Sequence, residues 1–301
     1  MTAVPAGAHG GDGARLAEAL GVRPGQVLDL SASLNPVAPD PRPVLERHLD
    51  AIGRYPDPRR ATDAMAAALG AGPGHVLLTN GGAEAIALLA NELGSGWVDE
   101  PDFSLYRRHL GRLDPSGPRW RSNPHNPSGR LAAPTDTADV WDEAFWPLAT
   151  GTWTRGDVAN NATVIGSLTK LLACPGLRIG YIYSADDDLI ARLHQRQPQW
   201  SLNGLAAEAL PDLLETVDLM TWAKETARLR NELGDTLERH GFTPQPSDAN
   251  WVLLHAPDLR DRLAPHGICI RDCTSFGLAG TVRIAVPNDE DRVRLERALT
   301  Q

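Results

Sequence analysis

One lysine stands between two apolar stretches, each of which is typical of a buried β-strand. The segment 163–184 is TVIGSLTKLLACPGLRIGYIYS, in which residues 163–165 and 177–183 predict the strands and Lys170 lies in the turn between them. Burial disfavours the charged form of an amine and lowers its pKa, so that the amine becomes a nucleophile able to form a Schiff base. The position favours covalent catalysis by Lys170, and the alternative is a surface lysine in an ordinary loop.

Groups suited to an anion accompany this lysine. Ser167 and Thr169 offer hydroxyls, and Arg178 offers a planar guanidinium that fits a phosphate. A strand predicted at 75–79 runs into a helix predicted from 80 to 93, and Gly82 and Ala83 would place free backbone N–H groups at its start. The two segments together predict a phosphate cup beside a reactive amine, which is the chemistry of pyridoxal phosphate enzymes.

The pattern Ser-x-Thr-Lys followed by Pro-Gly-Leu-Arg-x-Gly-Tyr resembles the cofactor-lysine segment of fold type I pyridoxal phosphate enzymes, the aspartate aminotransferase superfamily. The resemblance implies an α/β fold, with a large domain built on a mostly parallel central sheet and a smaller C-terminal α+β domain. It implies pyridoxal 5'-phosphate as the cofactor, held by Lys170. We expect an arm at 1–40, the large domain at 41–197 and the small domain at 198–301.

The same resemblance implies three contacts to the cofactor ring. Phe103, after Pro-x, would stack on the pyridine ring; Tyr106 is its rival, and a core aromatic is the alternative. Asn126, in the turn 123–129, would donate to the O3′ oxygen. Asp142, at the end of a short predicted strand, would face the pyridine nitrogen and keep it protonated, which makes the ring an electron sink. A solvated aspartate is the alternative for Asp142.

The N-terminal pattern His-Gly-Gly-Asp, followed by Asp-Leu-Ser-Ala-x-x-Asn-Pro, resembles the opening of L-threonine-O-3-phosphate decarboxylases, relatives of the histidinol-phosphate aminotransferases. It implies substrate-binding roles for His9, Gly10 and Asn35, whereas the residues alone also allow a flexible arm without function. Ser33 stands where a second asparagine is expected.

Arg271 and Arg283 lie within predicted strands, where a charged side chain is unexpected unless an anion pairs with it. By resemblance, Arg283 holds the substrate carboxylate. Arg271 would hold a substrate phosphate or form a structural salt bridge.

Tyr55, in the segment Arg-Tyr-Pro-Asp before a helix predicted at 60–69, is implied by the resemblance to reach the cofactor phosphate of a neighbouring subunit. The expected assembly is a homodimer, and an ordinary surface tyrosine is the alternative.

Two features depart from the family pattern. Phe145 stands where relatives have a tyrosine whose hydroxyl bonds O3′. Only residues 130–139 connect the Asn126 turn to the Asp142 strand, and Pro134 would break a long crossover helix there. The sequence predicts a trimmed large domain.

In the C-terminal part we expect one helix at 214–240, a strand at 268–272 and a strand at 281–286.

The formal net charge of −9, without a run of Lys or Arg, argues against binding to nucleic acid or acidic membranes. No apolar run is long enough to span a bilayer, and the first residues lack the pattern of a secretion signal, so the expected location is the cytoplasm. Three cysteines suggest no disulfide framework. A zinc set of His255, His266, Cys269 and Cys273 matches no defensible spacing.

These observations predict a lyase that decarboxylates a phosphorylated amino acid resembling L-threonine-O-3-phosphate through a Schiff base on Lys170, with a possible place in cobalamin biosynthesis. An aminotransferase resembling the histidinol-phosphate enzymes is the first alternative. A catalytically silent relative that binds the cofactor or a protein partner is the second.

Overall fold

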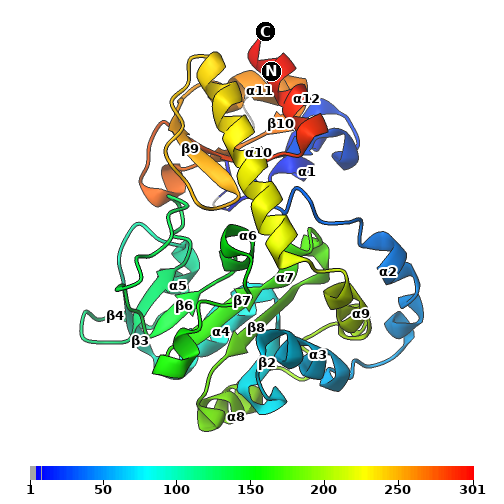
Figure 1. Ribbon diagram of the computed structural model, residues 1–301, viewed down its shortest axis with the longest axis vertical. Helices are drawn as coiled ribbons and strands as arrows, with labels where there is room; N and C mark the ends of the chain where they lie inside the picture. The colour runs from blue at the N-terminus through cyan, green and yellow to red at the C-terminus, as the bar shows by residue number, and fades with distance from the viewer. Residues whose placement is uncertain (1–4, 8) are drawn as a thin grey trace.

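The computed structural model describes residues 5–7 and 9–301. Four residues at the start of the predicted arm, and Ala8, lie outside the described residues. Figure 1 shows a lower body built around a large sheet and an upper body that contains α1, β9, β10 and α10–α12, with the C-terminal end of the chain on the upper body. We call them the large and the small domain.

A seven-stranded sheet forms the centre of the large domain within the described part of the chain, in the order β2-β8-β7-β6-β5-β3-β4. Neighbours from β7 to β4 pair in parallel, and β8 alone runs antiparallel to both β2 and β7. The strands are β2 (Val76–Asn80), β3 (Ser95–Val98), β4 (Arg112–Leu113), β5 (Arg119–Ser122), β6 (Val140–Asp142), β7 (Thr163–Ser167) and β8 (Ile179–Tyr183). The mostly parallel sheet expected from the sequence is confirmed.

Strands β2 and β7 of this sheet are buried on both faces, as their continuous apolar runs require. Alternate side chains enter different cores: Val164 packs in one hydrophobic cluster with residues of α3 and α9, whereas Ile165 packs in another with residues of α4 and α8. The covering helices of the large domain are α2 (Arg42–Glu46), α3 (Arg59–Leu69), α4 (Gly81–Leu93), α5 (Ser104–His109), α6 (Trp146–Thr150), α7 (Leu168–Leu171), α8 (Asp187–Arg196) and α9 (Gly204–Glu215).

The small domain has its own core. A three-stranded antiparallel sheet, β11-β12-β9, shares this core with a parallel pair formed by β1 and β10. Its elements are α1 (Gly13–Leu20), β1 (Leu28–Asp29), α10 (Leu219–Arg239), β9 (Trp251–His255), α11 (Leu259–Leu263), β10 (Ile268–Cys269), β11 (Arg271–Asp272), β12 (Thr281–Ala285) and α12 (Asp289–Leu299). Because β1 pairs with β10, the N-terminal segment is anchored in the small domain.

Helix α10 joins the two bodies, as Figure 1 shows. Its first turn packs in the large-domain core through Leu219 and Trp222, and its later turns pack in the small-domain core through Leu229 and Leu233. The division at residue 198 stays a prediction. Helix α9, which that division gives to the small domain, packs against α3 and shares the large-domain core.

Two predicted elements are wrong in their bounds. The single helix expected at 214–240 is broken, because α9 ends before Thr216 and Asp218 caps a new helix by accepting the N–H of Thr221. The strand expected at 268–272 is divided: Ile268 and Cys269 pair with β1, and Arg271 and Asp272 pair with β12. Apolar periodicity alone could not reveal either change of partner.

The connection between β5 and β6 contains no helix in the structure, which agrees with the expected trimming. Arg155 holds this loop: its NH2 group donates to the carbonyls of Ala133, Pro134 and Asp136, and its guanidinium lies over the ring of Trp141 at 4.8 Å. Arg155 thus stabilises the connection between β5 and β6, which contains no helix.

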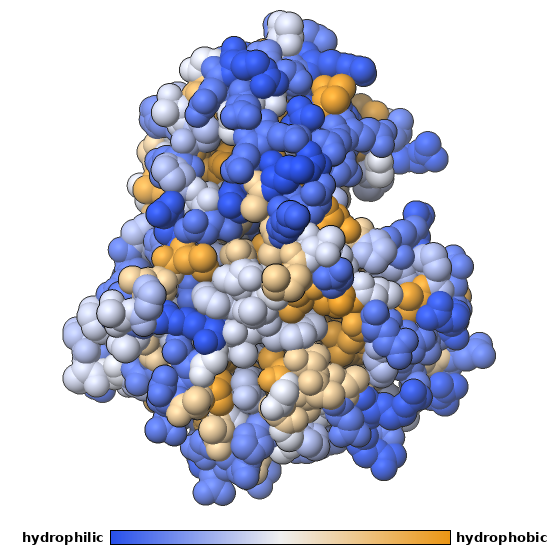
Figure 2. Space-filling model, viewed as in Figure 1, coloured by the Kyte–Doolittle hydropathy of each residue, from blue (hydrophilic) through white to orange (hydrophobic). Residues whose placement is uncertain are grey.

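The view in Figure 2 is mostly hydrophilic over the small domain, and apolar residues gather over the large domain below it. Among the described residues, no helix has the length and apolar character needed to cross a membrane.

Candidate active site

Lys170 lies in the short helix α7, directly after β7, and its side chain is partly buried. Burial lowers the pKa of Lys170; the carboxylate of Asp142 opposes this effect, and the charges of Arg178 and Arg283 add to it. Asn35 fastens the backbone here, since its N–H donates to the carbonyl of Lys170 at 3.0 Å and its amide donates to that of Leu171 at 2.9 Å. The structure therefore places Asn35 on the backbone of the lysine segment.

The predicted phosphate-binding groups meet at the N-terminus of α4. Gly82 lies against Ser167, where a Cβ on the glycine would come within 3.3 Å of the serine Cβ. Ser167 Oγ and Thr169 Oγ1 are 2.9 Å apart. Gly81, which the sequence analysis did not assign, has φ +73°, and a Cβ there would lie 2.5 Å from the Arg178 guanidinium.

These contacts form a cradle that added side chains would fill. A Cβ on Gly180 would lie 2.4 Å from the backbone of Gly81, so the close approach of β8 to the start of α4 requires a glycine at position 180. Among residues 5–7 and 9–301, no carboxylate forms an ion pair with Arg178. Free N–H groups, two hydroxyls and a guanidinium without a carboxylate partner fit the phosphate of pyridoxal 5'-phosphate.

Asp142 is held by two hydrogen bonds. The hydroxyl of Tyr106 donates to Oδ2 at 2.8 Å, and the N–H of Ala144 donates to Oδ1 at 3.0 Å. Burial raises the pKa of Asp142, and these two donors together with Lys170 oppose the rise. Sequence reasoning considered Tyr106 only as a rival for ring stacking. Its spacing of three residues from Phe103 on one helix was the available signal.

Phe103 lies at the start of α5, with its ring 5.8 Å from the Tyr106 ring and 5.7 Å from the ring of His9. His9 thus reaches the site from the N-terminal segment. Burial lowers the pKa of His9, and the positive charges of Arg271, Arg108 and Lys170 lower it further. Gly10 packs so tightly that a Cβ would lie 2.0 Å from the carbonyl oxygen of Ser31.

Ser33, where an asparagine was expected, is fully buried and has φ 50°. Asparagine tolerates this left-handed region better than most residues, which explains the expected residue type.

Both predicted substrate arginines are buried and lie opposite each other on adjacent strands, Arg271 on β11 and Arg283 on β12. Arg283 NH1 donates to Oδ1 of Asn126 at 2.9 Å, and its guanidinium lies 4.8 Å from the ring of Trp251. Burial lowers the pKa of Arg283 to about 9, and the charge of Arg271 contributes. Arg271 NH2 donates to Ser275 Oγ at 3.2 Å.

Phe145 faces the lysine: Nζ of Lys170 lies 5.5 Å from its ring centre. The ring packs edge to face on Trp251, at 4.6 Å between ring centres. Trp251 was not assigned from the sequence, although it connects Phe145 to Arg283.

Tyr55 does not join the other residues within one chain. Its side chain is 79% exposed and packs on the exposed ring of Trp200, at 4.5 Å between ring centres. A role at the cofactor requires a second subunit.

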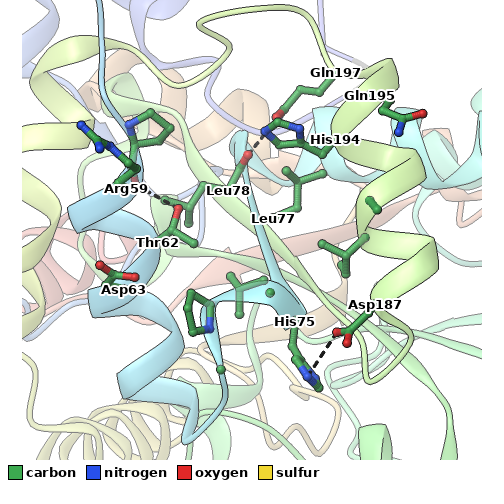
Figure 3. A pocket seen from close by; sticks show the side chains of 17 residues that line it. Arg59, Thr62, Asp63, His75, Leu77, Leu78, Asp187, His194, Gln195 and Gln197 are labelled. Carbon is green, nitrogen blue, oxygen red and sulfur yellow. Dashed lines mark hydrogen bonds and ion pairs between the residues drawn. The ribbon is translucent and has the colours of Figure 1, made fainter.

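A cavity of about 860 Å³ lies apart from these residues, between α3, β2 and α8, as Figure 3 shows. His75 and Asp187 form an ion pair at its wall, and none of the predicted site residues lines it. Within the described ranges, no three His, Cys, Asp or Glu side chains are grouped so that they could hold a metal ion.

Residues 120–300 match the family described as aminotransferase class I and II. Threonine-phosphate decarboxylase of Salmonella typhimurium is 30% identical to this chain, in an alignment that covers 97% of this chain and 95% of that protein. The chain belongs to the class I and II aminotransferase family.

Histidinol-phosphate aminotransferase of Methanothermobacter thermautotrophicus, another relative in this family, is 28% identical over 93% of this chain and 90% of its own length. In fold, the chain is similar to histidinol-phosphate aminotransferase from Sinorhizobium meliloti, solved in complex with pyridoxal-5'-phosphate. The TM-score is 0.80 and the identity 19%, with 95% of this chain and 92% of that chain covered. The resemblance to fold type I enzymes, the fold class and the cofactor, pyridoxal 5'-phosphate, are confirmed.

Proposed function

We propose that the chain is a pyridoxal phosphate-dependent lyase that decarboxylates a phosphorylated amino acid resembling L-threonine-O-3-phosphate. The observation that carries this proposal is the pair of buried guanidinium groups of Arg271 and Arg283 on adjacent strands, of which Arg283 lowers the pKa of Lys170. Two guanidinium groups on facing positions of adjacent strands offer several N–H donors and two positive charges, which suit a ligand with more than one negative charge. A phosphorylated amino acid carries a phosphate and a carboxylate.

In this proposal, Arg283 binds the substrate carboxylate and Arg271 the substrate phosphate. His9 and Gly10 close the site from the N-terminal segment, and Arg108 adds positive charge near His9. Asn35 contributes through its hydrogen bonds to the backbone of the lysine segment. The relation to threonine-phosphate decarboxylase of Salmonella typhimurium supports this choice of substrate class.

When bound, pyridoxal 5'-phosphate supplies an electron sink that stabilises negative charge at the substrate Cα. The lowered pKa of Lys170 favours its uncharged amine, which would hold the cofactor covalently and could carry a proton to or from Cα. Asp142, whose carboxylate accepts a hydrogen bond from Tyr106, would face the ring nitrogen and keep it protonated. Phe103 would cover the ring face and Asn126 would donate to O3′. The phosphate would be bound by Gly82, Ala83, Ser167, Thr169 and Arg178.

The assembly in this proposal is a homodimer in the cytoplasm, in which Tyr55 of each subunit reaches the phosphate cup of its partner. The exposed position of Tyr55 supports this arrangement, because 79% of the residue is exposed and its ring packs on the exposed ring of Trp200. A role in cobalamin biosynthesis belongs to the same proposal.

An aminotransferase acting on a phosphorylated amine is the second candidate, supported by the relation to histidinol-phosphate aminotransferases. The two reactions use the same cofactor residues and differ in which bond to Cα is broken. The test is to incubate purified holoenzyme with O-phospho-L-threonine, O-phospho-L-serine and L-histidinol phosphate, each with and without 2-oxoglutarate. We expect carbon dioxide from a phosphoamino acid without 2-oxoglutarate. Formation of a keto acid from a phosphoamino acid, or of a ketone from L-histidinol phosphate, only when 2-oxoglutarate is present would favour the aminotransferase.

A further inference from the structure

The carboxyl group of Asp102 is buried next to the candidate ring-stacking residue, with 3% of the residue exposed. It accepts three hydrogen bonds: from the N–H of Phe103 at 2.6 Å, and from the N–H and the hydroxyl of Ser122 at 3.0 and 2.5 Å. Burial raises the pKa of Asp102 to about 7, and the donors from Ser122 and Phe103 oppose the rise. Burying a carboxyl group costs free energy, and a neutral side chain at position 102 could fill the same space at a lower cost.

Ser122 extends these contacts to the turn that carries Asn126. It is the last residue of β5, and its Oγ accepts the N–H of Asn126 at 2.7 Å. The Ser122 hydroxyl donates its single proton to the hydrogen bond with Asp102. Its oxygen therefore acts as the acceptor in the hydrogen bond from the N–H of Asn126. A continuous polar chain runs from the backbone of Phe103, through Asp102 and Ser122, to the backbone of Asn126.

A second contact ties the same two segments. Nε2 of His125 donates to the carbonyl of Pro101 at 2.8 Å, so the loop before α5 and the turn after β5 are joined at two points. The small domain holds the other flank of the turn, since Nε1 of Trp251 donates to the carbonyl of Pro127 at 2.8 Å. The turn thus has fixed contacts on both sides.

We propose that Asp102 and Ser122 are positioning residues that fix Phe103 and Asn126 relative to each other, so that the cofactor ring is held in one orientation against Lys170. The inference rests on the proposed roles of Phe103 and Asn126 at the cofactor, and not on which substrate is used. Neither residue touches the substrate. Their effect passes through the two residues that they hold.

The test compares the variants Ser122→Ala, Asp102→Ala and Ser122→Thr with the parent protein. Ser122→Ala leaves the N–H of Asn126 without its acceptor, whereas Ser122→Thr keeps the hydroxyl. Thr236→Val is the matched control, because Thr236 is a fully buried hydroxyl in α10 that donates to the carbonyl of Glu232, far along the chain from the site. For each protein we would measure the affinity of the apoenzyme for pyridoxal 5'-phosphate by absorbance titration, the circular dichroism of the bound cofactor, the thermal midpoint, and kcat and KM.

Ser122→Ala and Asp102→Ala are expected to weaken cofactor binding about 10-fold or more, change the cofactor circular dichroism and lower kcat about 10- to 100-fold, with a smaller change in KM. Ser122→Thr is expected to recover most of the affinity lost in Ser122→Ala. Thr236→Val is expected to lower the thermal midpoint alone.

Cofactor affinity and circular dichroism equal to those of the parent, with only the thermal midpoint lowered, would overturn the proposal and leave the network a packing feature. Failure of Ser122→Thr to recover affinity, at a thermal midpoint equal to that of the parent, would also contradict it. Cofactor affinity, cofactor circular dichroism and the thermal midpoint do not depend on which substrate the enzyme uses. A parent protein that binds the cofactor but releases no carbon dioxide would contradict the proposed reaction and leave this inference standing.

Discussion

Oδ1 of Asn126 accepts a hydrogen bond of 2.9 Å from NH1 of Arg283, and both side chains are buried. This contact joins a turn of the large domain to strand β12 of the small domain. The candidate substrate arginine is thereby placed next to the candidate O3′ donor. The residue proposed to bind the substrate carboxylate and the residue proposed to bind O3′ thus share one hydrogen bond between domains.

Replacing Arg283 with lysine is expected to raise KM for the substrate, because an ammonium cannot reproduce the two-point fork that a guanidinium offers to a carboxylate. We expect kcat/KM to fall about 10- to 100-fold, with most of the change in KM. Arg239→Lys is the control, since Arg239 pairs with Glu296 at the surface. A KM for Arg283→Lys equal to that of the parent would show that Arg283 does not bind substrate.

Replacing Tyr106 with phenylalanine removes one of the two hydrogen bonds that Asp142 accepts. The Tyr106 hydroxyl lowers the pKa of Asp142 against the effect of burial, so its loss raises that pKa further. If the ionised carboxylate is the active form, the acidic limb of the pH profile of kcat moves to higher pH. Tyr183→Phe, in β8, is the control. An acidic limb at the same pH in Tyr106→Phe and the parent would mean that Tyr106 does not tune Asp142.

Much of this site could be predicted because its residues come in short continuous segments. Ser167, Thr169, Lys170 and Arg178 lie within 12 positions of one another, on one strand-turn-strand unit with clear alternation. The fold class followed from the resemblance of this unit to the cofactor-lysine segment of fold type I enzymes.

The contacts that could not be predicted join residues far apart in the chain. Three examples are the hydrogen bonds from Tyr106 to Asp142, from Arg283 to Asn126 and from Trp251 to Pro127. They depend on tertiary packing, which the periodicity of apolar residues does not reveal. The same reason explains why the strand expected at 268–272 was not seen as two pairings in different sheets.

Replacing Phe145 with tyrosine adds a hydroxyl to a ring that lies 5.5 Å from Nζ of Lys170. If this hydroxyl reaches the cofactor O3′, it stabilises the negative charge there, and the proton shared with the lysine-bound nitrogen is lost more easily. The yellow absorption band of the tyrosine variant is therefore expected to titrate at lower pH than that of the parent. A titration that is unchanged or displaced to higher pH would contradict the placement of Phe145 at O3′.

Tyr55 is expected to act across the interface of a dimer. The variants Tyr55→Ala and Lys170→Ala should each have little activity, and a mixture allowed to exchange subunits should regain part of it, because one site of the mixed dimer contains both native residues. Activity of the mixture is measured against each variant alone, with size-exclusion chromatography as the check on assembly. A fully active monomer would rule this arrangement out.

The most direct test of the account is to locate the cofactor on the chain. The sequence contains only two lysines, Lys170 and Lys224, and Lys224 is exposed on α10, so the protein carries its own control. Holoenzyme is reduced with borohydride, digested and analysed by mass spectrometry, in parallel with Lys170→Ala and Lys224→Ala. We predict a pyridoxyl group on Lys170 in the parent and in Lys224→Ala, and none in Lys170→Ala. A pyridoxyl group on Lys224, or a Lys170→Ala variant that still retains it covalently, would contradict the assignment.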